Sequence, residues 1–236
     1  MERVYLDEFS GSVVGGAAAG HIKKVLRLKA GDVFAGYDGA REFVLKVESF
    51  RGAEVEVAVE SERELPEAPC GRVTLAASMI KGPRWDMLLE KSAELGVGEI
   101  IPVVAERCVV RADAADAEGK LARWRRILGG AAAQCAGRAP AICGPVSMKQ
   151  LVAEVGDGFS GRIILLKGPE SAPLVDLLRG AGEGRIMILV GPEGDWTDAE
   201  ACAASEAGFR AASLGRLILR AETAAIAAAA VAASVL

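Results

Sequence analysis

Two loops marked by glycine contain the residues whose types and spacing best suit chemistry. The first follows the apolar run 185–190 and reads Gly191-Pro192-Glu193-Gly194-Asp195-Trp196. Two glycines around a proline form a compact turn with exposed backbone amides, which suits the polar edge of an adenine or a ribose. Thr197 and Glu200 then fit a capping box, so a helix begins here. A tight connection between strand and helix explains the same loop, and the loop alone favours neither interpretation.

The second loop joins a short strand at 211–214 to an alanine-rich helix, and it contains Gly215, Arg220 and Glu222. The small side chains of that helix must be buried for it to be stable. The two charged residues are therefore expected near an apolar wall, where charge interactions are stronger than in water. An ion pair or a capping glutamate would produce the same spacing. The pair is a candidate for catalysis or for a structural role alone.

Other catalytic motifs fit this chain poorly. Residues 156–161 match Gly-x-Gly-x-x-Gly, but they precede the strand at 163–166, whereas a dinucleotide-binding motif needs strand, glycines and helix in that order. We interpret them as a surface loop. The chain has neither a phosphate-loop motif nor a Gly-x-Ser-x-Gly elbow. With His21 as its single histidine and no Cys-x-x-Cys pair, it is predicted to bind no metal.

The elements that must position these loops fall into two regions. Up to residue 69, short β-type runs alternate with turn signals, which is typical of a small barrel, and the charged stretch 60–69 connects two cores. Beyond it, apolar strands alternate with helices, which predicts a mostly parallel sheet between helices. We therefore predict an α/β protein with domains at 1–69 and 70–236. Ligands in such folds bind at the carboxyl ends of the strands.

The individual elements follow from hydrophobic periodicity and turn signals. The expected strands are 3–6, 33–36, 43–49, 54–60, 73–77, 100–104, 163–166, 186–190 and 211–214, and the expected helices are 85–95, 117–133 and 224–236. The last helix is read as buried or at an interface, because 13 apolar and small residues fall short of the about 20 that span a membrane. No membrane partner is expected.

Composition limits the partners and the compartment. The chain has 236 residues, 51% of them apolar, and its 28 basic and 32 acidic residues give a net charge of -4. It lacks the overall positive charge of many nucleic-acid binders, so a polyanion would have to be bound by a local cluster of basic residues. Basic runs at 21–29 and 120–126 are candidates for this, although such runs are more often solvated helix faces. The five cysteines are odd in number, which argues against a disulfide framework, and no signal peptide is recognised. Both observations predict a cytoplasmic protein.

Taken together, the motifs closely resemble those of the RsmE family, methyltransferases for N3 of a uridine in 16S ribosomal RNA. The matching stretches are 189–200, 214–224, 21–29, 81–84, 90–97 and 106–108. The resemblance implies a carboxyl-terminal SPOUT-type α/β trefoil knot with a parallel sheet and an amino-terminal PUA-like RNA-binding β-barrel. It also implies S-adenosylmethionine as methyl donor, and a homodimer that acts on 16S rRNA or the small ribosomal subunit.

The resemblance also assigns residues to roles. It makes Arg220 and Glu222 catalytic, with Arg220 stabilising charge on the uracil oxygens and Glu222 orienting Arg220 or taking the N3 proton. The implied cofactor-binding residues are Leu166, Lys167, Gly168, Pro169, Glu170, Val190, Gly191, Pro192, Glu193, Gly194, Leu214, Gly215, Leu217, Ile218 and Leu219. The implied RNA-binding residues are His21, Lys23, Lys24, Arg27, Lys81, Arg84, Arg107 and Arg138.

The chain departs from the family pattern at three places. The segment 133–138 has lost an acid and has gained an alanine before its glycine, which leaves the role of Arg138 open. Leu217 replaces a common arginine, and Asp195 stands where glycine is frequent. Two alternatives follow: a non-catalytic RNA-binding or ribosome-assembly module with a SPOUT fold, and a SPOUT methyltransferase that acts on another RNA.

Overall fold

The protein consists of two compact units. The computed structural model describes residues 1–109, 117–168 and 170–236. The first unit comprises residues 1–67 and 126–139, and the second comprises residues 68–125 and 140–236. Helix α3 (Ala117–Cys135) contributes residues to both units. Each unit has its own hydrophobic core.

The first unit contains a curled, mixed sheet of five strands in the order β1-β3-β4-β5-β2. Strands β1 and β3 pair in parallel, and the remaining pairs are antiparallel. Helix α1 (Gly16–His21) and a π-helix, η1 (Ile22–Leu26), connect β2 to β3. The strand bounds are β1 (Arg3–Tyr5), β2 (Val13–Val14), β3 (Val33–Tyr37), β4 (Arg41–Arg51) and β5 (Glu54–Glu64).

Strand β5 is longer than the sequence predicts. The alternation expected over 54–60 holds for Val55 and Val57, which are buried in the core with Phe34 and Phe43. The expected end of the strand at residue 60 is wrong, because pairing with β4 continues to Glu64. Both faces of this extension are exposed. Cross-strand ion pairs, Arg41 with Glu62 and Arg63 with Glu42, take the place of apolar contacts there.

The second unit is built on an eight-stranded sheet, and the prediction of an α/β protein with a parallel sheet is confirmed. The strand order is β11-β13-β10-β12-β6-β7-β8, with β9 also pairing with β7, and every pair is parallel. The strand bounds are β6 (Val73–Ser78), β7 (Glu99–Val104), β8 (Ala141–Ile142), β9 (Val146–Ser147), β10 (Phe159–Leu165), β11 (Ala172–Pro173), β12 (Arg185–Val190) and β13 (Arg210–Ser213).

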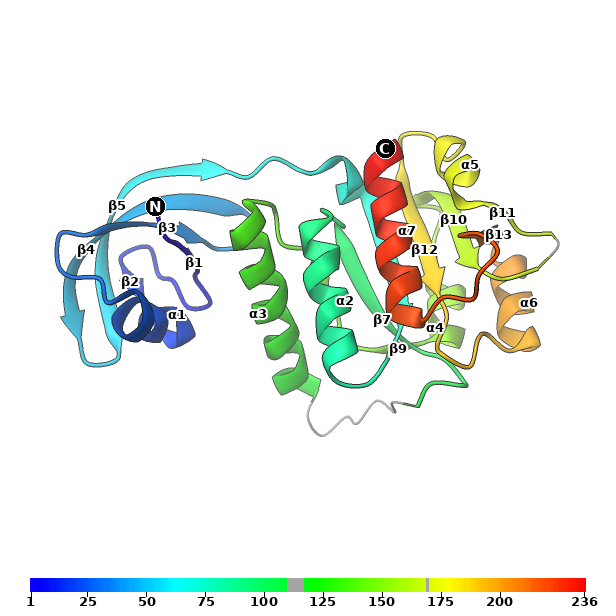
Figure 1. Ribbon diagram of the computed structural model, residues 1–236, viewed down its shortest axis with the longest axis horizontal. Coiled ribbons are helices and arrows are strands. Elements are labelled where there is room, and N and C mark those ends of the chain that lie inside the picture. Colours follow the sequence, from blue (N-terminus) through cyan, green and yellow to red (C-terminus); the bar gives the residue numbers. More distant parts are fainter. Residues whose placement is uncertain (110–116, 169) are drawn as a thin grey trace. The chain divides into compact units, whose positions relative to one another are not determined.

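Helices cover both faces of this sheet (Figure 1). Helix α7 lies against β6 and β12, with α2 on one side of it and α5 on the other. On the opposite face, α4 and α6 pack over a core that includes Met187 and Leu189 of β12. Burial on both faces explains why β12 reads as an uninterrupted apolar run. The helix bounds are α2 (Pro83–Glu94), α4 (Met148–Glu154), α5 (Leu174–Arg179), α6 (Asp198–Glu206) and α7 (Ala221–Val235), and a 3-10 helix, η2 (Pro69–Arg72), precedes β6.

Alanine lets α7 approach the sheet closely. The side chains of Ala225, Ala228, Ala229 and Ala232 are fully buried, at the spacing of one helix face. The sequence-based expectation of a buried helix here is therefore confirmed. In the described ranges, no helix is both long enough and apolar enough to cross a membrane.

One backbone contact in this unit gives a stability test. A Cβ at Gly98 would lie 1.7 Å from the carbonyl oxygen of Gly71. The Gly98 backbone cannot move aside easily, because its N–H donates to Val73 and its carbonyl accepts from Ala141. We expect Gly98→Ala to lower the free energy of unfolding by about 2 kcal/mol or more, as measured by urea denaturation.

The control for this test is Gly144→Ala, because a Cβ at Gly144 meets nothing within 4 Å. It should change the free energy of unfolding by less than about 0.5 kcal/mol. Equal effects of the two substitutions would contradict the close approach of the two backbones.

Candidate functional site

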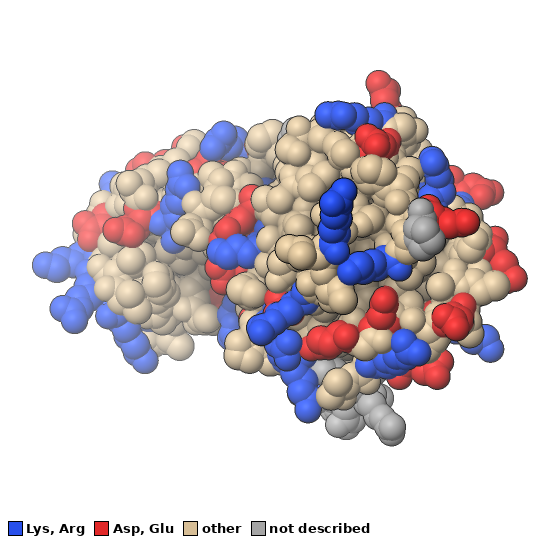
Figure 2. All heavy atoms as spheres, turned by 45° about the vertical axis from the view of Figure 1, so that its right-hand side comes forward, with Lys and Arg blue, Asp and Glu red and all other residues tan. Residues whose placement is uncertain are grey.

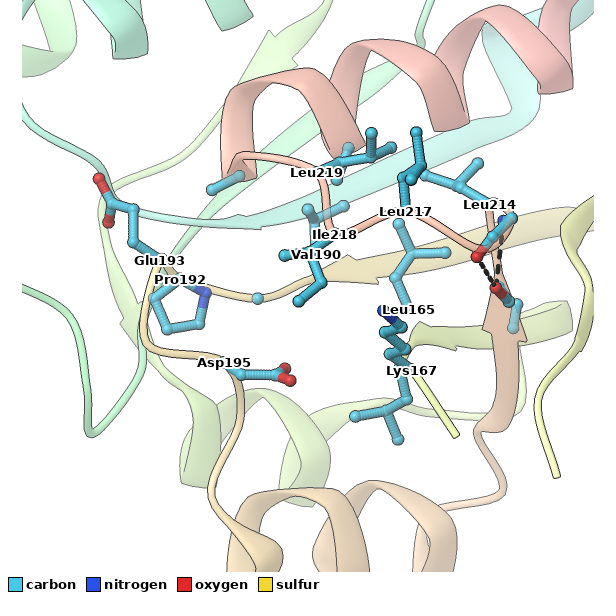
Figure 3. Close-up of a pocket in the computed structure, with 17 residues that line it drawn as sticks. Leu165, Lys167, Val190, Pro192, Glu193, Asp195, Leu214, Leu217, Ile218 and Leu219 are labelled. Atoms are coloured by element: carbon cyan, nitrogen blue, oxygen red, sulfur yellow. Dashed lines mark hydrogen bonds between the residues drawn. The ribbon is translucent and has the colours of Figure 1, made fainter. Parts of the chain in front are cut away.

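Three loops meet at the carboxyl edge of the parallel sheet and enclose a pocket (Figure 3). They follow β10, β12 and β13, and β10 lies between the other two strands, so the loops leave the sheet side by side. The pocket is lined by Leu165, Leu166, Lys167, Val190, Gly191, Pro192, Glu193, Asp195, Ala212, Ser213, Leu214, Gly215, Leu217, Ile218, Leu219, Ala221 and Ala224. Two loops selected from the sequence thus contribute to one site.

The loop after β12 is held rigidly. A Cβ at Gly191 would lie 3.1 Å from Nε1 of Trp196, so the glycine allows the buried indole to pack beneath the turn. Asp195 has a left-handed backbone with φ 62°, and its Oδ1 accepts from the Trp196 amide at 2.8 Å. The predicted capping box is present, with reciprocal hydrogen bonds between Thr197 and Glu200. The Asp195 side chain extends into the space between the loops (Figure 3).

Arg107 ties this loop to the end of β7. Its Nη1 donates to the carbonyl oxygens of Gly194 at 2.9 Å and Trp196 at 3.3 Å. A residue that the sequence suggested as an RNA contact therefore also has a role in fixing the pocket wall. Beside it, burial raises the pKa of the Cys108 thiol, so this group stays neutral at pH 7.

The loop after β13 presents apolar side chains to the pocket. Gly215 has φ 127°, a backbone conformation that side-chain-bearing residues rarely adopt. Ser213 Oγ accepts from the Gly215 amide at 3.1 Å and donates to its carbonyl at 3.0 Å (Figure 3). Leu217 and Ile218 line the pocket yet are 81% and 84% exposed. These side chains form an apolar surface that a flat ligand would cover.

A buried carboxylate lies next to this pocket. Glu222 is only 3% exposed, and its Oε2 has no hydrogen-bond partner. In the described part of the chain its basic partner is Arg84, whose Nη1 lies 3.9 Å from Oε2 and 3.1 Å from Oε1 of Glu193. Arg220 is exposed and is the N-cap residue of α7. The amino-terminal end of α7 favours a negative charge at Glu222.

Most of the residues that the sequence suggested for cofactor binding line this pocket. Gly168 lies in an adjoining hollow with Lys167 and Arg216, Gly194 faces Arg107, and Glu170 is outside the lining. Pro169 lies outside the described residues. The lining residues that the sequence did not indicate are Leu165, Asp195, Ala212, Ser213, Ala221 and Ala224. Of these, Asp195 could have been found from its place between the two motif residues Gly194 and Trp196.

Several predicted RNA contacts belong to the first unit. His21, Lys24 and Arg27 are exposed. Lys23 is part of the fold there, because its Nζ donates to the carbonyls of Gly52 at 2.7 Å and Glu54 at 2.8 Å. Lys23 and Lys24 belong to the π-helix η1, and His21 and Arg27 flank it.

Arg138 is paired with acids of the same unit. Its guanidinium lies 3.0 Å from Glu67 and 3.8 Å from Glu64. Ala136, the residue gained in this segment, has a left-handed backbone with φ 54° where α3 ends. The altered segment therefore ends a helix and does not line the described pocket.

In the second unit, Lys81 is exposed and Arg84 faces the two glutamates. Acidic and basic side chains are interspersed on the face shown in Figure 2. Among the described residues, no group of three or more His, Cys, Asp or Glu side chains could hold a metal ion.

The parallel sheet with three loops around one pocket matches a known class of protein. The model of a family described as "RNA methyltransferase domain" matches residues 66–233. A protein from Legionella pneumophila, solved with its bound cofactor S-adenosylmethionine, is 31% identical with a TM-score of 0.83, over 98% of this chain and 96% of that one.

Relatives with more specific names identify the family within this class. Ribosomal RNA small subunit methyltransferase E from Neisseria gonorrhoeae, solved with S-adenosylmethionine, is 32% identical with a TM-score of 0.81, over 98% of this chain and 95% of that one. The relative of the same name from Synechocystis is 31% identical over 86% of this chain. The matched region spans 66% of that relative, less than two thirds of its length. The chain belongs to the RsmE family, as its motifs predict.

The hydrogen bonds of Arg107 predict how the loop after β12 responds to substitution. Arg107→Ala removes two donors to the carbonyls of Gly194 and Trp196, so the loop should open locally more often. We expect amide hydrogen exchange at residues 194–197 to accelerate about tenfold or more, since each of the two lost hydrogen bonds is worth about 0.5 to 1.5 kcal/mol. Exchange in β12 should not change.

The control is Arg179→Ala, which removes an exposed guanidinium from α5. It should leave exchange at residues 194–197 as in the unaltered protein. If Arg107→Ala also leaves this exchange unchanged, Arg107 does not hold the loop.

Proposed function

We propose that the protein transfers the methyl group of S-adenosylmethionine to N3 of a specific uridine in 16S rRNA. The observation that carries this proposal is the pocket formed by three loops with a buried carboxylate at its edge. Membership of the RsmE family and two neighbours solved with S-adenosylmethionine support it. They agree with the enzyme class and the methyl donor that the sequence predicts.

The lining of the pocket fits this donor. Leu217 and Ile218 offer apolar surface for the adenine ring. Gly191 keeps the backbone of the turn free of a side chain, so that its polar groups can reach adenine or ribose. Asp195 extends a carboxylate into the pocket, where a cationic ligand would be attracted. When bound, the donor supplies an electrophilic methyl group on a sulfonium.

The residues of the chain have to place the base and make N3 nucleophilic. Uridine N3 carries a proton, and the ring becomes a good nucleophile only as that proton leaves. We assign to Arg220 the stabilisation of negative charge on the uracil oxygens, because its guanidinium is exposed where α7 begins. Glu222 orients Arg220 or accepts the N3 proton. The three loops exclude water from the reacting atoms.

The remaining assignments complete this proposal. Residues 1–69 form a PUA-like RNA-binding barrel, which the curled sheet of the first unit supports. The second unit, which makes up most of the predicted domain 70–236, forms a SPOUT trefoil knot; the path of α7 from β13 back across β6 and β12 supports this. The protein works as a cytoplasmic homodimer. The proposed RNA contacts are His21, Lys23, Lys24, Arg27, Lys81, Arg107 and Arg138.

The activity and the substrate can be tested together. A strain that lacks the gene should lose N3-methyluridine at one position of its small-subunit rRNA, and the intact gene should restore it. Calorimetry should show the purified protein taking up one S-adenosylmethionine per chain. A binding module without chemistry would take up no donor, and a methyltransferase for another RNA would leave the small-subunit rRNA of the deletion strain unchanged.

The role of Arg220 predicts a separation of binding from catalysis. Arg220→Ala should lower kcat for rRNA methylation by about 100-fold or more, because it removes charge stabilisation that is made only in the transition state. Donor affinity, measured by calorimetry, should change less than about threefold. Arg179→Ala should keep normal activity. Normal methylation by Arg220→Ala would remove Arg220 from the catalytic role.

A further inference from the structure

Arg84 occupies an unusual place for a cation. It is the second residue of α2, after the N-cap Gly82 and Pro83. The amino-terminal end of a helix carries partial positive charge, so acidic residues are favoured there and a guanidinium is disfavoured. Negative partners are therefore needed, and Glu193 at 3.1 Å and Glu222 at 3.9 Å provide them.

The two partners come from two different segments beside the pocket. Glu193 lies in the turn after β12, and Glu222 lies in the first turn of α7. The Glu222 side chain is 4% exposed, so its charge depends on nearby compensation. Both carboxylates are paired with the same guanidinium nitrogen, Nη1, which is within hydrogen-bond distance of Glu193 and forms a longer ion pair with Glu222.

We propose that Arg84 is a positioning residue of the methyl-transfer site. By bridging Glu193 and Glu222, Arg84 holds the turn after β12 in register with the start of α7. This assignment replaces the interpretation of Arg84 as an RNA contact, and it rests on the proposed function. Arg84 acts through the two carboxylates, not on the reacting atoms.

The two roles of Arg84 differ in their measurable consequences. A residue that contacts a phosphate contributes to RNA affinity, so its loss raises KM for RNA and lowers the dependence of binding on salt. A residue that positions the pocket contributes to donor binding and to the transition state. Its loss lowers donor affinity and kcat while KM for RNA is kept.

The first experiment needs no turnover. Calorimetry with S-adenosylmethionine compares the full-length protein with Arg84→Ala, Glu193→Gln and the double variant. We expect Arg84→Ala to weaken donor binding about fivefold, and we expect the double variant to bind no more weakly than the weaker single variant. Additive losses, or unchanged binding by Arg84→Ala, would overturn the bridge.

The second experiment measures methylation of small-subunit rRNA. Arg84→Ala should lower kcat at least tenfold with KM for RNA unchanged within twofold, and Arg84→Lys should recover part of the lost kcat. Lys81→Ala, at an exposed lysine close to Arg84 in sequence, should instead raise KM. A raised KM with normal kcat for Arg84→Ala would restore the RNA-contact interpretation.

Two checks distinguish an unfolded variant, an error in the proposed function and an error in the role of Arg84. Urea denaturation shows whether each variant is folded, and Arg84→Lys serves if Arg84→Ala is not. If the unaltered protein takes up the donor but methylates no rRNA, the proposed function is wrong. The calorimetric cycle then still decides whether Arg84 couples the two loops.

Discussion

The site depends on the parallel pairing of β10 with β12 on one side and β13 on the other. Ile164 lies opposite Leu189 in one neighbour and Ala211 in the other, so the three strands end at the same edge of the sheet. The loops that follow them are thereby brought together, although they are not adjacent along the chain. A shift of one residue in either pairing would turn the strand's side chains to the opposite face and separate the loops. Burial of β12 on both faces makes such a shift costly.

The sequence predicted the parts of this arrangement whose signals are local. Strand β12 is a continuous apolar run, and the capping box at Thr197 marks the start of α6 within one residue. Strands β8, β9 and β11 were not predicted, because two residues carry no periodicity. The cluster of Arg84, Glu193 and Glu222 was also not predicted, since Arg84 is more than a hundred residues from either glutamate along the chain and only the strand order brings them together.

Two departures from the family pattern have different physical consequences. Asp195 and Ala136 both adopt a left-handed backbone, which glycine tolerates without strain. At Asp195 the side chain accepts a hydrogen bond from the next amide, and this offsets part of the strain. Alanine at 136 has no polar side chain, but the left-handed turn lets the Gly137 N–H donate to the Ala132 carbonyl at 2.9 Å, which closes the end of α3. The left-handed residue is thus offset by a side-chain acceptor in the pocket loop and by backbone hydrogen bonds at the end of α3.

The alanines of α7 bear on the electrostatics of the site as well as on packing. Because Ala225 and Ala228 are small, the helix lies close to the sheet, and its first turn buries Glu222 beside the pocket. A charge buried in this way is surrounded by fixed dipoles and a guanidinium in place of mobile water. Such groups need little reorganisation when charge moves during a reaction, whereas water would have to reorient. Larger side chains in α7 would push its first turn away from the sheet and admit water to the carboxylate. The small residues that look like simple packing in the sequence are therefore a condition for the proposed chemistry.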